Sequence, residues 1–297
     1  MGEIAAVLTA LSWGFTSIFI SKASKAAGSK NVNRTRIALS TIFLISVHLI
    51  LQGELLPFNA SPERWFWLGI SGIVGLIIGD GFLFQCYVMI GPRLGMMIMA
   101  SVPIISTFFA WIFLGETLSI IKILGIVICI IGIAIVIFEQ YNGNDTKKNR
   151  KSFILGILAG FGGALGQAIG LILAKQGLFG DFPSISGVVI RMFVSSIVIW
   201  IIAIIKNEAS NTIKQTLTHW NVTKPIIAGT ITGPFIGVWL SMVAIQSTYV
   251  GIASTLMALT PIFMLPLSRW LYKEKISLTA ILGTVISIIG ITIIFIL

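Results

Sequence analysis

The sequence predicts an all-α integral membrane protein, with about ten transmembrane helices arranged as two inverted five-helix repeats. The first observation is composition: 56% of the 297 residues are hydrophobic and 10% are charged, whereas soluble domains carry about 25% charged residues. Mean hydropathy is +1.01. So few ionisable residues cannot cover the surface of a water-soluble globule. The other two observations are the lengths of the apolar runs and an internal repeat.

Long apolar runs alternate with short polar connections along the whole chain. A helix needs about 20 apolar residues to span the hydrocarbon core, and the runs approach or exceed that length. They lack the polar alternation of a membrane β-barrel. The expected spans are residues 3–21, 35–52, 65–89, 94–114, 119–138, 153–174, 184–205, 225–246, 250–272 and 277–297.

The second half of the chain repeats the first, which indicates a duplication. Identical residues recur 158 positions apart, namely Pro103 and Pro261, Glu116 and Glu274, Gly125 and Gly283, and Gly132 and Gly290. The match weakens near the start of each half, where Arg36 and Arg191 correspond at a spacing of 155. We therefore expect a first five-helix repeat at residues 1–141, a linker at 142–152 and a second repeat at 153–297.

An odd number of helices in a duplicated unit requires the two copies to insert with opposite orientations. The basic residues agree with this expectation. Connections after the odd-numbered helices hold 16 Lys and Arg residues, and those after the even-numbered helices hold 3. By the positive-inside rule the odd connections are cytoplasmic, which places both termini outside.

The same pattern excludes several other classes of protein. The formal net charge of +10 comes from residues that flank apolar runs, so we assign it to topology and expect no nucleic-acid partner. The sequence has no phosphate-binding loop, no HExxH and no GxSxG motif, and we expect no enzyme activity, cofactor or metal. The expected partners are the lipid bilayer and a small-molecule substrate, and the chain is either a monomer or a homodimer.

Several motifs together resemble the EamA type of the drug/metabolite transporter superfamily. They are Ser12-Trp13-Gly14, the stretch Arg36 to Ser40, and Leu114-Gly115-Glu116-Thr117-Leu118 within the block Pro103 to Gly132, which the second half repeats around Pro261 and Glu274. The resemblance implies a ten-helix secondary carrier made of inverted repeats, and many such carriers export amino acids, other metabolites or drugs.

The sequence departs from this family pattern in two ways. Family members are usually drawn with both termini in the cytoplasm, which opposes the orientation from the charge count. The second half also has Gly166-Gln167 near the place of the Trp13-Gly14 pair. We therefore expect an asymmetric site.

Asp80 is the leading candidate for the functional site, because it is the only acidic residue deep inside an apolar run. A charge at the bilayer centre costs at least about 2.5–3.5 kcal/mol, so such residues usually face a cavity or a partner. Asp80 would carry a proton or contact a cationic substrate group. Alternatively it is a neutral buried carboxyl, or a structural partner of Arg36. Helical spacing places Phe84 and Tyr87 on the same stripe, where they line a cavity or simply pack.

Further candidates come from polar or adaptable side chains in apolar runs. Trp13, Thr16, Met99 and Gln167 would bind substrate, although packing also explains them. Gln167 lies in Gly162-x-x-x-Gly166-x-x-x-Gly170, which is typical of a close-packing face. Gly125 with Gly132, and Gly283 with Gly290, also predict packing seams.

The prolines and the remaining charged residues complete the set of candidates. Pro103 and Pro261 would form hinges or static kinks, and Pro234 and Pro266 would add breaks. Arg36 and Arg191 would extend to the membrane interface or bind a carboxylate. Glu116 and Glu274 are expected to stabilise helix starts.

Taken together, these features predict a secondary transporter in the cytoplasmic membrane that moves small organic metabolites, such as amino acids or drugs, by alternating access. Export follows from the resemblance, and proton coupling through Asp80 is a hypothesis. The alternative is a non-transporting membrane scaffold or receptor component.

Overall fold

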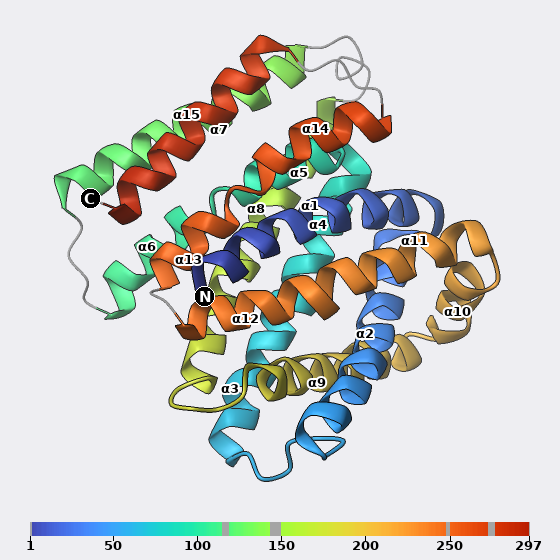
Figure 1. Cartoon of the computed structure of the whole chain (residues 1–297). Coiled ribbons are helices and arrows are strands. Elements are labelled where there is room, and N and C mark those ends of the chain that lie inside the picture. Colours follow the sequence, from blue (N-terminus) through green and yellow to red (C-terminus); the bar gives the residue numbers. More distant parts are fainter. Residues whose placement is uncertain (1, 115–118, 143–149, 248–249, 273–276, 297) are drawn as a thin grey trace.

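The computed structural model describes residues 2–114, 119–142, 150–247, 250–272 and 277–296, and every regular element in these ranges is a helix (Figure 1). Glu116 and Glu274 lie outside the described residues. Six helical segments are long and apolar enough to cross a bilayer, namely Gly2–Ala27, Ser29–Gln52, Pro62–Ile90, Arg150–Gly177, Ser184–Ile205 and Trp220–Ser247. The chain is therefore a multi-pass, all-α membrane protein.

The elements in chain order are α1 (Gly2–Ala27), α2 (Ser29–Gln52), α3 (Pro62–Gly72), η1 (Ile73–Gly79), α4 (Asp80–Ile90), α5 (Pro92–Met99), α6 (Val102–Leu114), α7 (Ile120–Asn142), α8 (Arg150–Gly177), α9 (Ser184–Ile205), α10 (Ala209–Leu217), α11 (Trp220–Thr230), η2 (Ile231–Gly237), α12 (Val238–Ser247), α13 (Val250–Met257), α14 (Thr260–Tyr272) and α15 (Leu278–Ile296). The two η segments are π-helical and join their flanking α-helices into one continuous rod each.

The first long helix of each half packs against a three-part rod of the other half. Helix α8 packs along α3, η1 and α4, whereas α1 packs along α11, η2 and α12. Glycines permit the first contact, because a Cβ added at Gly166 would lie 2.6 Å from the Gly79 Cα, and one at Gly170 would lie 3.0 Å from the Gly75 Cα. The close-packing face predicted for this helix is confirmed.

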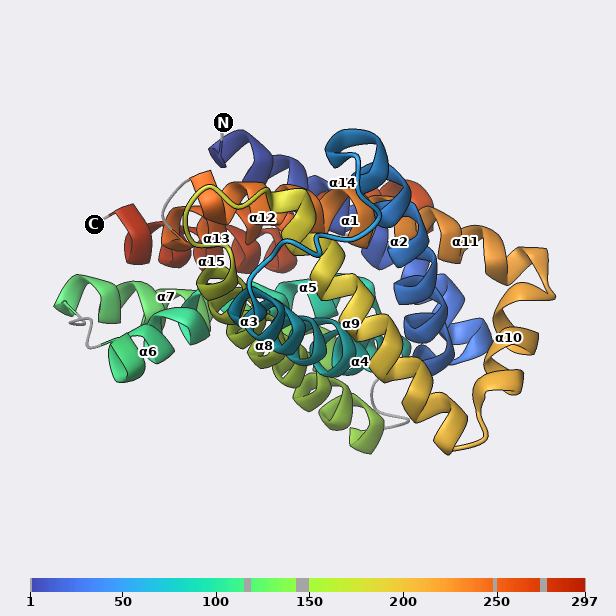
Figure 2. The same ribbon diagram turned by 90° about the horizontal axis from the view of Figure 1, so that it is seen from below.

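Helices α7 and α15 form a second tight contact at one edge of the bundle (Figure 1 and Figure 2). A Cβ added at Gly132 would lie 2.4 Å from the backbone nitrogen of Ser287, and one at Gly290 would lie 2.3 Å from that of Cys129. The predicted glycine seams are therefore confirmed. Gly132 and Gly290 are equivalent in the repeat, and so are the residues that they contact, Ser287 and Cys129. The two helices are therefore antiparallel and related by local two-fold symmetry.

Matched interruptions occur in both halves at the 158-residue spacing. The π-helices η1 and η2 have this offset, and so do the breaks at Ala100–Ser101 and Ala258–Leu259. Pro103 and Pro261 are each the second residue of the helix that follows the break. A proline is tolerated there because the first turn of a helix does not use its N–H groups.

The break expected at Pro266 is absent, because α14 continues through that residue to Tyr272. Pro234 lies within η2 rather than at a gap between helices.

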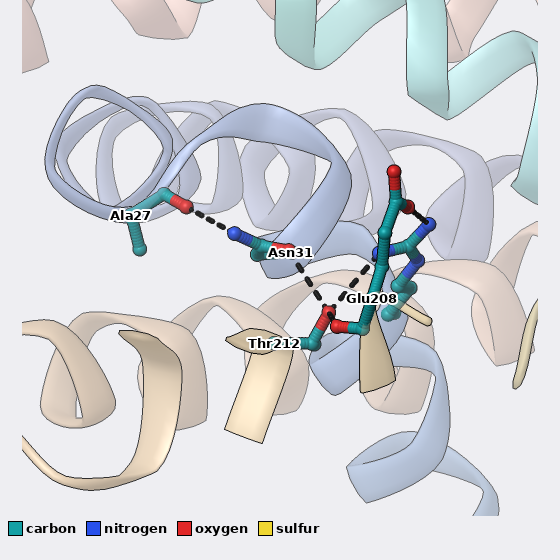
Figure 3. A network of polar contacts seen from close by, with 5 residues as sticks. Ala27, Asn31, Glu208 and Thr212 are labelled. Carbon is teal, nitrogen blue, oxygen red and sulfur yellow. Dashed lines mark hydrogen bonds and ion pairs between the residues drawn. The ribbon is translucent and has the colours of Figure 1, made fainter. Parts of the chain in front are cut away.

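Two connections inferred from hydropathy are helical in the structure. Helix α2 begins at Ser29, so Arg34, which precedes the expected span 35–52, lies inside the helix rather than in a loop. The segment 206–224 contains α10 and the start of α11. Figure 3 shows how α10 is attached to α2: Arg34 forms an ion pair with Glu208 and donates a 3.1 Å hydrogen bond to the Thr212 hydroxyl. Polar residues that pair with one another can be buried in a stretch that hydropathy identifies as a loop.

Candidate functional site

A buried ion pair connects α2 to the start of α4. The Arg36 Nη2 atom lies 2.6 Å from the Asp80 Oδ2 atom, and the two side chains are 3% and 14% exposed. Asp80 is the first residue after η1, and a π-helical segment is frequently found at a functional site. Of the interpretations left open for Asp80, a partnership with Arg36 is what the structure contains.

Asn33 fixes the position of this pair. Its side-chain oxygen accepts a 3.0 Å hydrogen bond from Arg36 Nη2. Its side-chain nitrogen donates a 2.9 Å hydrogen bond to the Leu76 carbonyl oxygen in η1. Since Arg36 and Asn33 are one helical turn apart on α2, both side chains point to the same neighbouring rod.

Aromatic side chains continue from the ion pair along α4. The Arg36 guanidinium lies 4.8 Å from the centre of the Phe84 ring. The rings of Phe84 and Tyr87 are stacked, with centroids 5.9 Å apart and an interplanar angle of 23°. The Tyr87 hydroxyl lies 2.9 Å from the Met96 sulfur. The common stripe expected for Asp80, Phe84 and Tyr87 is therefore present.

A cavity beside the ion pair has walls from both halves of the chain. Its walls surround about 570 Å³ of space not filled by atoms, a value that includes the part open to the outside. Every residue predicted to bind substrate lines it, namely Trp13, Thr16, Asp80, Phe84, Tyr87, Met99 and Gln167. The structure thus places together side chains from α1, α4, α5 and α8.

A second, apolar cavity adjoins the first and includes both predicted hinges. Pro103 and Pro261 line it, together with Ala100 and Ala258 at the breaks that precede them. The two cavities share Trp13, Met96, Met99 and Gln167. The interrupted helices therefore border the space in which a solute would move.

The polar residues of the cavity differ in their hydrogen bonding. The Thr16 hydroxyl is satisfied, since it lies 2.8 Å from the Ser12 carbonyl oxygen and 2.9 Å from the Thr232 hydroxyl. Gln167 forms no hydrogen bond with any residue in the described ranges. Its polar atoms therefore stay available to a ligand.

The asymmetry expected near Trp13 has a structural basis. A Cβ added at Gly237 would lie 2.8 Å from the Trp13 indole, just as one at Gly79 would lie 3.2 Å from the Gly166 backbone. Because Gly79 and Gly237 are repeat equivalents, Gly166 takes the place of Trp13 in the second half. Only the first half contributes an indole to the cavity.

Arg36 and Arg191 were expected either to extend to the membrane interface or to bind a carboxylate. They are 3% and 2% exposed and both line the cavity, so the first alternative is wrong. Arg36 binds the Asp80 carboxylate, as the second alternative allowed. The signal that would have identified both arginines is their recurrence at a spacing of 155, in apolar runs that also hold the predicted site. Val238, Ser241, Ser254 and Thr260 also line the two cavities and were not predicted.

The fold and this site define a polytopic helical membrane protein of the transporter class. The sequence matches the EamA-like transporter family over residues 1–138 and again over residues 154–296, so the chain belongs to that family. The resemblance to the drug/metabolite transporter superfamily is confirmed, and proteins of the family are transporters.

Structural comparison shows a likeness of fold. A solved structure described only as "Crystal structure of protein" shares the fold, with a TM-score of 0.70 and 13% sequence identity, over 98% of this chain and 95% of that one. A comparison with curated proteins gives no match. Within the described ranges, no group of three His, Cys, Asp or Glu side chains is arranged to hold a metal ion.

Proposed function

We propose that the protein is a secondary transporter that moves a small organic solute across the cytoplasmic membrane by alternating access. The observation that carries this proposal is the cavity between the halves with the buried pair of Asp80 and Arg36. Ionisable residues inside membrane helices mark substrate and ion pathways. Interrupted helices at matched positions, here near Pro103 and Pro261, are typical of a carrier's central site.

The transport unit consists of ten spans in two inverted repeats, residues 1–141 and 153–297, joined by a linker at 142–152. The antiparallel packing of the equivalent helices α7 and α15 supports this arrangement, as do the π-helices 158 residues apart. Inverted repeats allow one half to rock against the other around a fixed site.

Asp80 is proposed as the coupling residue and export as the direction. Protonation of Asp80 would remove the charge that holds Arg36, so proton binding and release would alter the contact between α2 and α4. Family membership favours export as the direction. The orientation remains a choice between termini outside, from the basic residues, and termini inside, from the family pattern. A reporter fused after Leu297 decides between them.

Counterflow in proteoliposomes tests transport directly. Vesicles with the full chain are loaded in turn with unlabelled amino acids, nucleosides or cationic drugs, and entry of the labelled compound is measured. We expect at least one compound to accumulate transiently, and a pH gradient to change its rate. Exchange no faster than in protein-free vesicles across the whole panel would instead support the scaffold or receptor alternative.

A further inference from the structure

The Arg191 guanidinium of α9 forms no ion pair with any described residue. The carboxylate that acts on it electrostatically is Asp80, which is already paired with Arg36. The Arg191 side chain is 2% exposed. Its hydrogen bond to the described part of the chain goes from Nη1 to the Met242 sulfur at 3.0 Å, and Nε has no partner. Because a thioether is a weak acceptor and two guanidinium groups share one carboxylate, one positive charge is buried in excess, which is unfavourable unless a ligand supplies the opposite charge.

Comparison of the two halves shows what is missing beside Arg191. Arg36 and Arg191 are equivalent, and so are Asp80 and Val238, the residues that directly follow η1 and η2. In the first half the arginine pairs with a carboxylate. In the second half a valine occupies the carboxylate's place, and both positions line the same cavity. The lining residues thus carry two positive charges against one negative charge.

The groups around Arg191 suit a planar anion. Arg191 lines the cavity, and Gly75 lies against its guanidinium, where an added Cβ would be 3.3 Å from Nη2. The unpartnered amide of Gln167 lines the same cavity. The guanidinium fork matches a carboxylate with two parallel hydrogen bonds. The aromatic wall of Trp13, Phe84 and Tyr87 would cover an apolar remainder of the solute.

Resting on the proposed transport function, we infer that Arg191 binds a carboxylate of the solute. The substrate class is small organic acids and amino acids with an aromatic or branched apolar part. The solute's carboxylate would lie beside Arg191 in the same way that the Asp80 carboxylate lies beside Arg36. Neutral analogues and amines without a carboxylate would bind weakly, because they leave the Arg191 charge uncompensated.

Matched probes test this inference on the full chain in lipid nanodiscs. 3-Phenylpropionate is compared with 3-phenylpropanamide, and 4-methylpentanoate with 4-methylpentanamide, by calorimetry. L-Phenylalanine and phenethylamine form a third pair. We expect each carboxylate to bind at least about tenfold more tightly than its partner, as expected when a buried charge loses its counter-ion. Arg191→Gln should abolish this discrimination.

Two further variants keep the result independent of misfolding. Arg34→Gln is the matched control, since Arg34 is also buried but pairs with Glu208 outside the cavity, and it should leave discrimination unchanged. Val238→Asp supplies an internal carboxylate while Arg191 stays in place. It should weaken carboxylate binding at least about tenfold, as expected when the charge to be compensated is already paired, whereas Val238→Asn should weaken it less.

The inference is overturned if the amides bind as tightly as the carboxylates, if no probe binds, or if discrimination survives in folded Arg191→Gln. Counterflow with the same probes separates it from the transport proposal. Binding that depends on Arg191 without counterflow upholds the inference and contradicts transport. Counterflow of phenethylamine or of an amide at a rate that Arg191→Gln does not change would uphold transport and contradict the inference.

Discussion

The Cys129 thiol and the Ser287 hydroxyl lie 3.3 Å apart, although 158 residues separate them along the chain. They occupy the same position in the two halves, so the local two-fold axis between α7 and α15 passes close to both atoms. Gly132 and Gly290 allow the backbones to approach on either side. Neither helix lines the two central cavities. The α7–α15 pair therefore joins the halves at a distance from the site.

Ser287→Cys should form a disulfide with Cys129 on mild oxidation. The 3.3 Å separation of the present side-chain atoms brings two sulfur atoms close to bonding distance. Mass spectrometry after proteolysis would detect the linked peptides, with the oxidised wild type as control, since its two cysteines are both unpaired. Counterflow should persist after cross-linking. Loss of transport on oxidation, restored by reduction, would show that α7 and α15 must move apart.

Gly166→Ala should destabilise the protein by about 1–3 kcal/mol, the usual cost of overpacking. The added methyl would lie 2.6 Å from the Gly79 Cα, and backbone cannot move aside as a flexible side chain does. Gly81→Ala is the control on the opposing rod, because no atom lies within 4 Å of an added Cβ. Thermal unfolding in detergent should show a lower Tm for the first variant alone. Equal values would contradict the close approach of α8 to η1.

Asp80→Asn should lower stability and abolish most transport. The change leaves Arg36 as an unpaired buried charge, and removal of one partner of such a pair costs about 3–5 kcal/mol. The double variant Arg36→Gln with Asp80→Asn should recover stability but not transport. Asp181→Asn, at an exposed carboxylate, is the matched control. Wild-type counterflow with unchanged pH dependence in Asp80→Asn would exclude Asp80 as the coupling residue.

The sequence predicted the cavity well because its strongest signal was local and rare. One carboxylate in a long apolar run must face a partner or a cavity, and helical spacing then places Phe84 and Tyr87 beside it. The 158-residue repeat likewise predicted the glycine contacts of α7 and α15. Both predictions depend on residue types that have few physical alternatives at those positions.

Arg36 and α10 were harder to predict, because polar groups can be buried when they satisfy one another. Hydropathy began the second span at residue 35, whereas α2 begins at Ser29. Arg36 lies just inside that expected span, and its charge was counted with the preceding connection, although its ion pair with Asp80 allows deep burial. The polar face of α10 is buried against Arg34 and Thr35 in the same way, and a pattern search on a single segment does not detect such pairing.

Pro103→Ala and Pro261→Ala should lower turnover about tenfold or more while solute affinity is kept, if the breaks gate a slow step. Alanine restores a backbone N–H and removes the ring, so the helix pieces on either side of the break can join. Pro266→Ala is the control, because α14 continues through that position without a break. Counterflow rates and binding measured side by side give the test. Unchanged turnover in both variants would mean that the breaks are static.

The contact of α10 with α2 should weaken in acid. The hydrogen bond from Arg34, together with its positive charge and with Lys30 and Lys206, lowers the pKa of Glu208 below its usual 4.5, and burial opposes this only in part. A lowered pKa in the folded state means that the stabilisation is complete above pH 4.5 and is lost as pH falls through the lowered value.

A spin label at Lys214→Cys, on the exposed side of α10, would report this change. The label should become more mobile as the pH drops below the usual pKa of Glu208. With Glu208→Gln it should be mobile at every pH. A label equally immobile at about pH 3, below the usual carboxyl range, would show that the ion pair does not hold α10.

The π-helices η1 and η2 interrupt equivalent rods in the two halves. The charged residue Asp80 follows η1, whereas Val238 follows η2. In a carrier whose halves exchange conformations as proposed, this difference makes the two halves energetically unequal, because the ion pair holds the rod beside η1 and no such pair follows η2. We expect such an inequality to bias which side the empty protein faces at rest, so that a carboxylate introduced by Val238→Asp would shift that preference.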